Sequence, residues 1–128
     1  MMRLAYTTLA CPTWSIEQIF DAAQRYGYEG VEMRLLDGEV ITSSLPAAVR
    51  QQVSAMSQRT GVPIVCVDTS VSIASVDPTE RETQLREGLA MLELAAAWEA
   101  PCIRVFAFTS ADVTPTAAFN SAVDCFGR

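Results

Sequence analysis

The chain of 128 residues contains no histidine, and this absence narrows the chemistry that it can carry. Histidine is the usual general base at neutral pH and the commonest metal ligand, so both roles lack their usual residue. Basic residues are also few, with nine Lys and Arg against fifteen Asp and Glu and a net charge of −6. Because binding to a phosphate backbone needs clustered basic side chains, we expect no nucleic-acid partner.

Closely spaced cysteines and long hydrophobic runs are missing too. The four cysteines are scattered without a C-x-x-C pair, which predicts reduced thiols rather than a zinc site or a disulfide framework. They are Cys11, Cys66, Cys102 and Cys125. No apolar run reaches the roughly 18 residues of a membrane span, so we expect no membrane partner. The first residues lack the layout of a signal peptide, and the expected location is cytoplasmic.

What the sequence does contain is a strand followed by a helical segment, four times over. Half of the residues are hydrophobic and 19% are charged, which is typical of a folded domain. The strands are predicted at Leu4–Thr8, Val31–Leu35, Ile64–Ser70 and Ile103–Phe106. Such α/β units build a parallel sheet, either doubly wound or closed into an eight-unit barrel. Because a TIM (β/α)8 barrel needs about 250 residues, this chain corresponds to half of one.

The first two predicted helices have clear signals at their ends. Ser15 and Gln18 form a potential capping box, and Gly27 ends the first helix in the left-handed conformation. Its apolar stripe consists of Ile16, Ile19, Phe20 and Ala23. The second helix is predicted to begin at Pro46 and to end at Thr60-Gly61. Its buried face consists of Val49, Val53 and Met56.

The third and fourth predicted helices complete the pattern. The third runs from about Thr79 to Trp98. Its predicted buried stripe consists of Leu85, Leu89, Leu92 and Ala96. The fourth begins at Pro115 after a Thr114 cap, and its apolar face stops after about three turns. We therefore expect one domain over residues 1–128, a (β/α)4 half-barrel with four strands and about four helices, truncated within the fourth helix.

Alternation along the strands places charged side chains on the face opposite the helices. Glu32 and Arg34 share one face of the second strand, and Arg104 lies between apolar neighbours on the fourth. Barrel interiors are normally filled by branched apolar side chains, so these three require an explanation. One interpretation is a buried ion pair between Glu32 and an arginine. The other is a substrate site near the carboxyl-terminal mouth, where guanidinium groups donate paired hydrogen bonds to substrate oxygens.

Residues at or beyond the strand ends provide further candidates. Trp14 could stack on a sugar ring or cover the barrel rim, and Thr8 and Ser70 could bind a polyhydroxylated ligand or serve as turn residues. Asp68 is expected to pair with Arg34 or Arg104, with an acid–base or metal-ligand role as the alternative. Weaker candidates in the same loops are Thr7, Asp37, Glu39, Ser72, Thr109 and Asp112.

Three segments resemble the xylose-isomerase-like TIM-barrel superfamily, and within it the sugar phosphate isomerase/epimerase branch. They are LAYTTLACPTWS at residues 4–15, GYEGVEMR at residues 27–34 and IRVF at residues 103–106. The resemblance covers nearly the whole chain but only the N-terminal half of the family's fold. It departs from the family before the fourth strand, where Glu99-Ala100-Pro101 replaces a common glycine.

The resemblance implies an enzyme that moves a proton between adjacent carbons of a keto or aldo sugar, sugar phosphate or polyol. A divalent metal, Mn²⁺, Mg²⁺, Co²⁺ or Zn²⁺, would polarise the substrate. In many members the metal ligands and acid–base carboxylates lie on the later strands, so no metal ligand or catalytic residue is assigned in this chain. The isolated chain is expected to be inactive and metal-free. Its expected substrate-binding or supporting residues are Glu32, Arg34, Arg104, Trp14, Thr8 and Ser70.

Two other functions remain open. The chain could be a complete noncatalytic half-barrel that forms a homodimer or pairs with another half-barrel through its open face. The superfamily also includes endonuclease IV-type DNA-repair enzymes, which carry metal-binding histidines in the first half of the barrel. An acidic chain without histidine fits that branch poorly.

Overall fold

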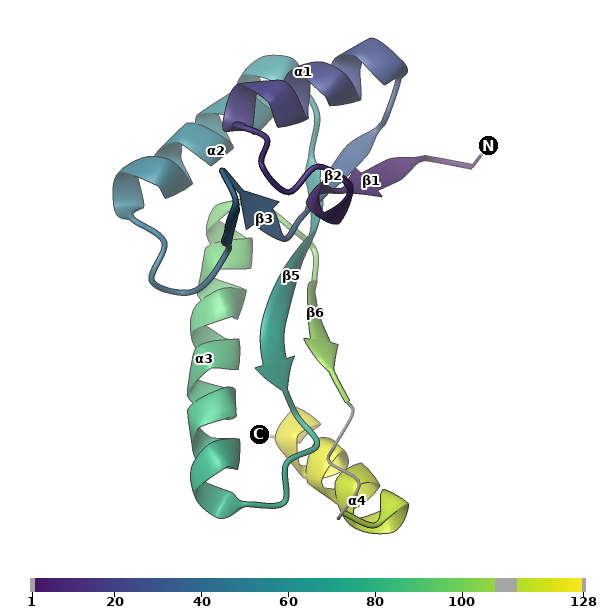
Figure 1. The fold of residues 1–128 in the computed structure, drawn as a ribbon, viewed down its shortest axis with the longest axis vertical. Coiled ribbons are helices and arrows are strands. Elements are labelled where there is room, and N and C mark those ends of the chain that lie inside the picture. The colour runs from purple at the N-terminus through teal and green to yellow at the C-terminus, as the bar shows by residue number, and fades with distance from the viewer. Residues whose placement is uncertain (1, 108–112, 128) are drawn as a thin grey trace.

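The structure is a computed structural model that describes residues 2–107 and 113–127. It consists of a sheet of four parallel strands and the helices that follow them (Figure 1). The sheet order is β1-β2-β5-β6. Its strands are β1 (Ala5–Thr7), β2 (Gly30–Met33), β5 (Ile64–Ser72) and β6 (Ile103–Phe106). The helices are α1 (Ile16–Tyr26), α2 (Ala47–Thr60), α3 (Pro78–Ala97) and α4 (Pro115–Phe126). This confirms the predicted parallel α/β architecture, which corresponds to half of a TIM barrel.

The predicted helix ends are confirmed where cap chemistry was the signal. Ser15 Oγ accepts from the Gln18 N–H, and the Gln18 side chain accepts from the Ser15 N–H, forming the capping box of α1. Gly27 and Gly61 end α1 and α2 with φ angles of 73° and 68°, in the left-handed region that glycine tolerates best. Thr114 caps α4 through the Ala117 N–H. Local hydrogen bonding therefore fixes these boundaries.

The predicted buried stripe of α3 is wrong. The helix buries Met91, Leu94 and Ala95, with Trp98 just beyond its end, whereas Leu89 and Leu92 are 55% and 48% exposed. Ala96 is exposed as well. Both sets have helical spacing, so periodicity alone could not decide which face meets the sheet. Leu89 and Leu92 instead line an apolar groove of about 350 Å³ between α3, the sheet strands β5 and β6, and the end of α4.

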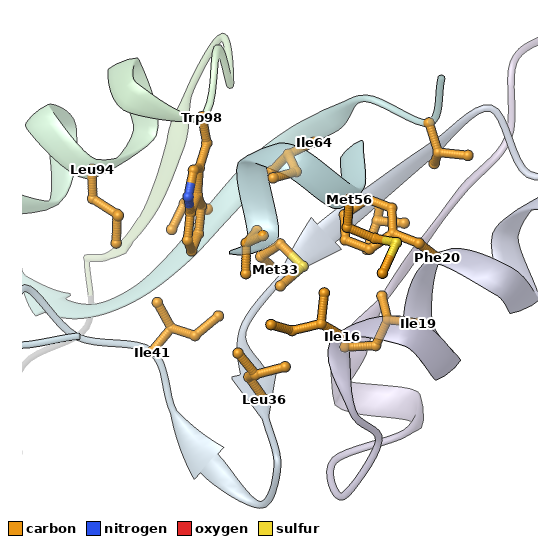
Figure 2. Close-up of a cluster of buried hydrophobic side chains, with 14 of the residues drawn as sticks. Ile16, Ile19, Phe20, Met33, Leu36, Ile41, Met56, Ile64, Leu94 and Trp98 are labelled. Atoms are coloured by element: carbon orange, nitrogen blue, oxygen red, sulfur yellow. The ribbon is translucent and has the colours of Figure 1, made fainter. Parts of the chain in front are cut away.

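The hydrophobic core lies between the sheet and α1, α2 and α3. Figure 2 shows side chains from all these elements meeting around Met33, with Phe20 and Met56 on one side and Trp98 on the other. Ile64 belongs to this core, although strict alternation would place it with Asp68 on the opposite face. The register of β2 with β5 shifts between Val31 and Glu32, so β5 has one extra residue at this point. Because of this bulge, Ile64 points to the opposite face of the sheet from the one that strict alternation along β5 predicts.

A short hairpin between β2 and α2 was not predicted. Strands β3 (Leu35–Leu36) and β4 (Glu39–Val40) pair antiparallel through Asp37 and Gly38, which have φ angles of 52° and 86°. Positive φ at both central residues is typical of a type I′ turn, for which Asp-Gly is a favoured sequence. The Asp37 N–H donates to the Trp14 carbonyl at 3.1 Å, which holds the turn against the first loop.

The last helix packs against the start of α3 rather than along the sheet. Figure 1 shows α4 beyond the carboxyl ends of β5 and β6. Arg81 forms an ion pair with Asp124 at 2.8 Å, and the Ser121 hydroxyl donates to the Ser75 carbonyl. Among the described helices, none is both long and apolar enough to cross a membrane.

Candidate functional site

Polar side chains on the face of the sheet opposite the helices form three layers along the strands. The upper layer, towards the carboxyl ends of the strands, contains Arg34 and Ser70. The middle layer contains Glu32, Asp68 and Arg104. The lower layer contains Cys66 and Cys102. Side chains two residues apart on a strand share a face, so layers from successive positions stack on one another.

The middle layer is organised by the ion pair between Asp68 and Arg104. These residues are register partners on β5 and β6, and Arg104 Nη2 lies 3.1 Å from Asp68 Oδ2. The Asp68 side chain is only 1% exposed, whereas that of Arg104 is 33% exposed. Within the described part of the chain, no donor makes a well-aligned hydrogen bond to Asp68 Oδ2, so charge attraction alone partners this oxygen. The predicted pairing of Asp68 with an arginine is thus observed.

Glu32 completes the middle layer as a carboxyl group beside a second carboxyl group. Its side chain shares a hydrogen bond with Asp68, and this contact, followed by burial and the negative charge of Asp68, raises the pKa of Glu32. Thr7 and Arg104 act in the opposite direction. Two neighbouring carboxylates repel when both are ionised, so the Glu32 carboxyl gives up its proton less readily here than it does in water. Of the two interpretations of Glu32, the ion pair with an arginine is not the main contact here, because Asp68 is the partner of Arg104.

The upper layer places Arg34 across the strand ends. Arg34 Nη2 donates to Ser70 Oγ at 2.9 Å, and Nη1 donates to the Asp68 carbonyl oxygen at 3.4 Å. Burial and the positive charge of Arg104 lower the pKa of Arg34. A guanidinium has five N–H donors, so donors remain for an external acceptor. Ser70 is exposed and stands next to them.

Thr8 and Trp14 lie in the segment between β1 and α1, and Thr8 contacts the end of β2. The fully buried Thr8 hydroxyl accepts from the backbone N–H groups of Arg34 and Leu35, at 2.8 and 2.9 Å. Thr8 therefore positions the end of β2 and has no exposed surface of its own. Trp14 is half-buried and packs against the core. Contact of either residue with a ligand stays a prediction.

The weaker candidates lie at several places. Asp37 and Glu39 belong to the hairpin, and the Ser72 N–H donates to Gln84 Oε1 at 2.9 Å. The Thr7 hydroxyl accepts from the Leu9 N–H at 3.3 Å. Thr109 and Asp112 lie outside the described residues.

One set of side chains offers the donor types of a metal site. One ligand atom each from Glu32, Cys66 and Asp68 lies within 4.8 Å of the others. The surroundings fit a hard divalent cation poorly, because Arg104 already supplies positive charge to Asp68. Burial, followed by the contact with Cys102, raises the pKa of Cys66 to about 12, so its thiol keeps its proton at neutral pH. Mn²⁺ and Mg²⁺ prefer oxygen ligands, and we assign no metal to this set.

Sequence reasoning missed two features of this face. The burial of Asp68 depends on its neighbours on β2 and β6, and the pairing of Cys66 with Cys102 depends on strand register. The sequence did contain a signal for the cysteine pair. Cys66 lies two residues before the acidic Asp68, and Cys102 lies two residues before the basic Arg104. If those charges meet across two parallel strands, so do the thiols.

Comparison with known proteins identifies the family. A model of the xylose isomerase-like TIM-barrel family matches residues 20–128, and the chain therefore belongs to this family. No curated protein sequence matches the chain significantly.

Solved structures show the same half-barrel relationship. The 3-keto-D-glucoside 4-epimerase of E. coli has a TM-score of 0.74 at 16% identity, covering 99% of this chain and 50% of its own. An AP endonuclease, family 2, of Brucella melitensis has a TM-score of 0.72 at 16% identity, covering 98% and 48%. An Anabaena variabilis protein described as a sugar phosphate isomerase/epimerase has a TM-score of 0.69 at 13% identity, covering 98% and 49%. The chain thus spans about half the length of these structures, and at these identities the likeness shows the fold.

Proposed function

We propose that the chain is the N-terminal half of a sugar or sugar phosphate isomerase or epimerase that acts by proton transfer on a keto or aldo sugar or a polyol. The observation that carries the proposal is the convergence of Arg34, Arg104 and Glu32 on the open face of the sheet. Family membership and neighbours described as sugar epimerases or isomerases support it. We also propose a cytoplasmic location.

In this proposal the two arginines bind the substrate. Arg34 is fixed by Ser70 and retains free donors, which suits a hydroxyl, carbonyl or phosphate oxygen. Arg104 lies between Asp68 and the ring of Phe106, with its guanidinium carbon 4.2 Å from the ring centroid. These contacts restrict its orientation before a substrate arrives, which reduces the entropy lost on binding. Glu32, Trp14, Thr8 and Ser70 complete the proposed substrate-binding and supporting groups.

Divalent-metal dependence of the complete enzyme is part of the proposal on family grounds. The metal would be Mn²⁺, Mg²⁺, Co²⁺ or Zn²⁺, and it would polarise the substrate for removal of a proton from carbon. No described residue is assigned to that metal, because the one cluster with suitable donors is balanced by arginine. The isolated chain is therefore proposed to be inactive.

The inactivity can be measured directly. Purified chain is incubated with Mn²⁺ and a panel of keto-pentoses and keto-hexoses, and the products are separated by chromatography. We expect no turnover. Product formation that follows the purified chain and exceeds that of a mock purification would contradict this part of the proposal.

The intact mass of the native protein tests whether the chain is the N-terminal half of a larger enzyme. The chain has a mass of 13.9 kDa. A native product near 30 kDa, roughly the mass of a 250-residue barrel, would supply the second half and with it the enzyme to assay. A native product of the mass of the chain itself would favour the second candidate function.

That second candidate is a noncatalytic half-barrel that associates with a second copy. The observation that favours it is the exposed apolar surface of the groove and of α4, where Phe119 and Phe126 are 67% and 76% exposed. Two copies could also pair β1 of one with β6 of the other, since these strands end the sheet order. Light scattering distinguishes the two, because a well-folded monomer contradicts this alternative. A DNA-repair endonuclease ranks third, given the acidic charge and the absence of histidine.

A further inference from the structure

Cys66 and Cys102 lie side by side although they are far apart in the sequence. Their position follows from the residues above them, since Asp68 and Arg104 are register partners whose side chains meet at 3.1 Å. Two residues earlier on both strands, alternation brings Cys66 and Cys102 to the same face and the same level. The Val67 N–H donates to the Cys102 carbonyl at 3.1 Å, which fixes this pairing.

The geometry of this pair suits a covalent bond. The Cys66 thiol donates to Asp68 Oδ1 at 3.8 Å, and the Cys102 thiol donates to the Val65 carbonyl next to Cys66 at 3.5 Å, so both sulfurs lie where β5 meets β6. Neighbouring strands are about 4.7–4.9 Å apart, and disulfides join residues whose Cα atoms are about 4.4–6.8 Å apart. The backbone therefore needs little movement to join the sulfurs. Cys102 is exposed and Cys66 is half-buried, so a small oxidant reaches the pair through Cys102.

We propose that Cys66 and Cys102 form an oxidisable dithiol, which a peroxide converts into an intrachain disulfide between β5 and β6. The Cys102 thiolate attacks one oxygen of hydrogen peroxide and the O–O bond breaks. The products are a sulfenic acid at Cys102 and a hydroxide ion, which takes up a proton to form water. The Cys66 sulfur then attacks the sulfenic sulfur, the S–S bond forms, and the oxygen leaves as water with the thiol proton. In total, two thiols are oxidised by two electrons and one peroxide is reduced to two waters.

The surroundings assign the order of the two steps. Because burial raises the pKa of Cys66 to about 12, this thiol is protonated at neutral pH and is a poor first nucleophile. The exposed Cys102 reacts first, and Cys66 resolves the sulfenic acid. The bond would lie one layer below the Asp68–Arg104 ion pair and would join the two strands that carry it. The test uses the chain alone, so its outcome does not depend on the proposed activity.

The positions of the arginines make the test direct. The chain has no lysine, and cleavage after arginine places each cysteine in a separate tryptic peptide. Cys66 falls in residues 60–81 and Cys102 in residues 87–104. Folded chain is treated with hydrogen peroxide, free thiols are blocked with iodoacetamide, and the tryptic peptides are analysed by mass spectrometry without reduction. Cys102→Ser is the test variant and Cys125→Ser the matched control, with circular dichroism as the check on folding.

We expect peptides 60–81 and 87–104 to appear linked, with iodoacetamide labelling lost at both cysteines together and restored by a reductant. The linked peptides should come from the monomer band of a nonreducing gel, persist in Cys125→Ser and disappear in Cys102→Ser. Three results would overturn the proposal. They are over-oxidation of Cys102 while Cys66 remains alkylatable, a disulfide found only between two chains, and a linked pair that involves Cys11 or Cys125 instead.

Discussion

Arg104 provides the positive charge next to Asp68, with 3.1 Å between Nη2 and Oδ2, while the Asp68 side chain is almost completely shielded from solvent. The two partners are therefore unequal. Loss of Asp68 leaves an arginine that water can still reach, whereas loss of Arg104 leaves a buried oxygen with no aligned donor among the described residues. The two substitutions are therefore expected to differ in their cost, with the larger cost at Arg104.

Arg104→Ala should destabilise the chain by about 1–3 kcal/mol. A broken, fully buried ion pair costs about 3–5 kcal/mol, and the partial exposure of Arg104 lowers that figure. Urea denaturation followed by circular dichroism measures the free energy of unfolding. Arg86→Ala, at an exposed position of α3, is the control and should change it by less than about 0.5 kcal/mol. Equal effects of the two variants would show that the ion pair contributes no specific stability.

In the complete enzyme, Arg104→Ala should lower kcat/KM by on the order of 100-fold. This corresponds to about 2–3 kcal/mol of transition-state stabilisation from one positioned charged donor. Steady-state kinetics of the two proteins, at matched folded fractions, gives the ratio. Unchanged kinetics together with a lower Tm would instead assign Arg104 a purely structural role with Asp68.

Glu32 should make the chain less stable as the pH rises. Its pKa is raised in the folded chain, mainly by the hydrogen bond with Asp68, so the folded state holds more protons than the unfolded state between the two pKa values. The stabilising effect is complete below the ordinary glutamate pKa of about 4.3 and is lost as the pH passes through the folded pKa.

Glu32→Gln should flatten this pH dependence, because the amide cannot ionise. Urea denaturation at a series of pH values measures the free energy of unfolding as a function of pH. The control Glu93→Gln, at an exposed position of α3, should show the same pH profile as the parent chain. A profile that is the same in the parent and in Glu32→Gln would show that Glu32 does not carry the effect.

Gly30→Ala should destabilise the chain by about 1–3 kcal/mol. A Cβ at position 30 would lie 2.4 Å from Val65 Cγ1, and a β-branched valine has few alternative rotamers with which to yield. Gly88→Ala in α3 is the matched control, since its Cβ would meet Val71 Cγ1 at an ordinary 3.6 Å. That variant should gain about 0.5–1 kcal/mol from helix propensity. If Gly30→Ala is as stable as the parent in urea denaturation, Val65 leaves room for a methyl group between β2 and β5.

Much of the fold was accessible from the sequence because its signals are local. The capping box at Ser15 and the left-handed Gly27 depend on hydrogen bonds and steric limits within a few residues. The Asp37-Gly38 turn was just as local, and an unrecognised turn signal explains why the hairpin was missed. The stripe of α3 failed for another reason, since two apolar faces with helical spacing compete and only the packed sheet selects one.

The sequence by itself determined the order of the four sheet strands and the four helices, because alternation and capping act over short distances. It also identified Glu32, Arg34 and Arg104 as charged side chains in the predicted strands. Tertiary structure alone decided which of these charges meet. The bulge in the pairing between Val31 and Glu32 placed Ile64 in the core. The register of β5 with β6 paired Arg104 with Asp68 and placed Cys66 next to Cys102. Register is set by the packing of whole strands against one another, and no local pattern encodes it fully.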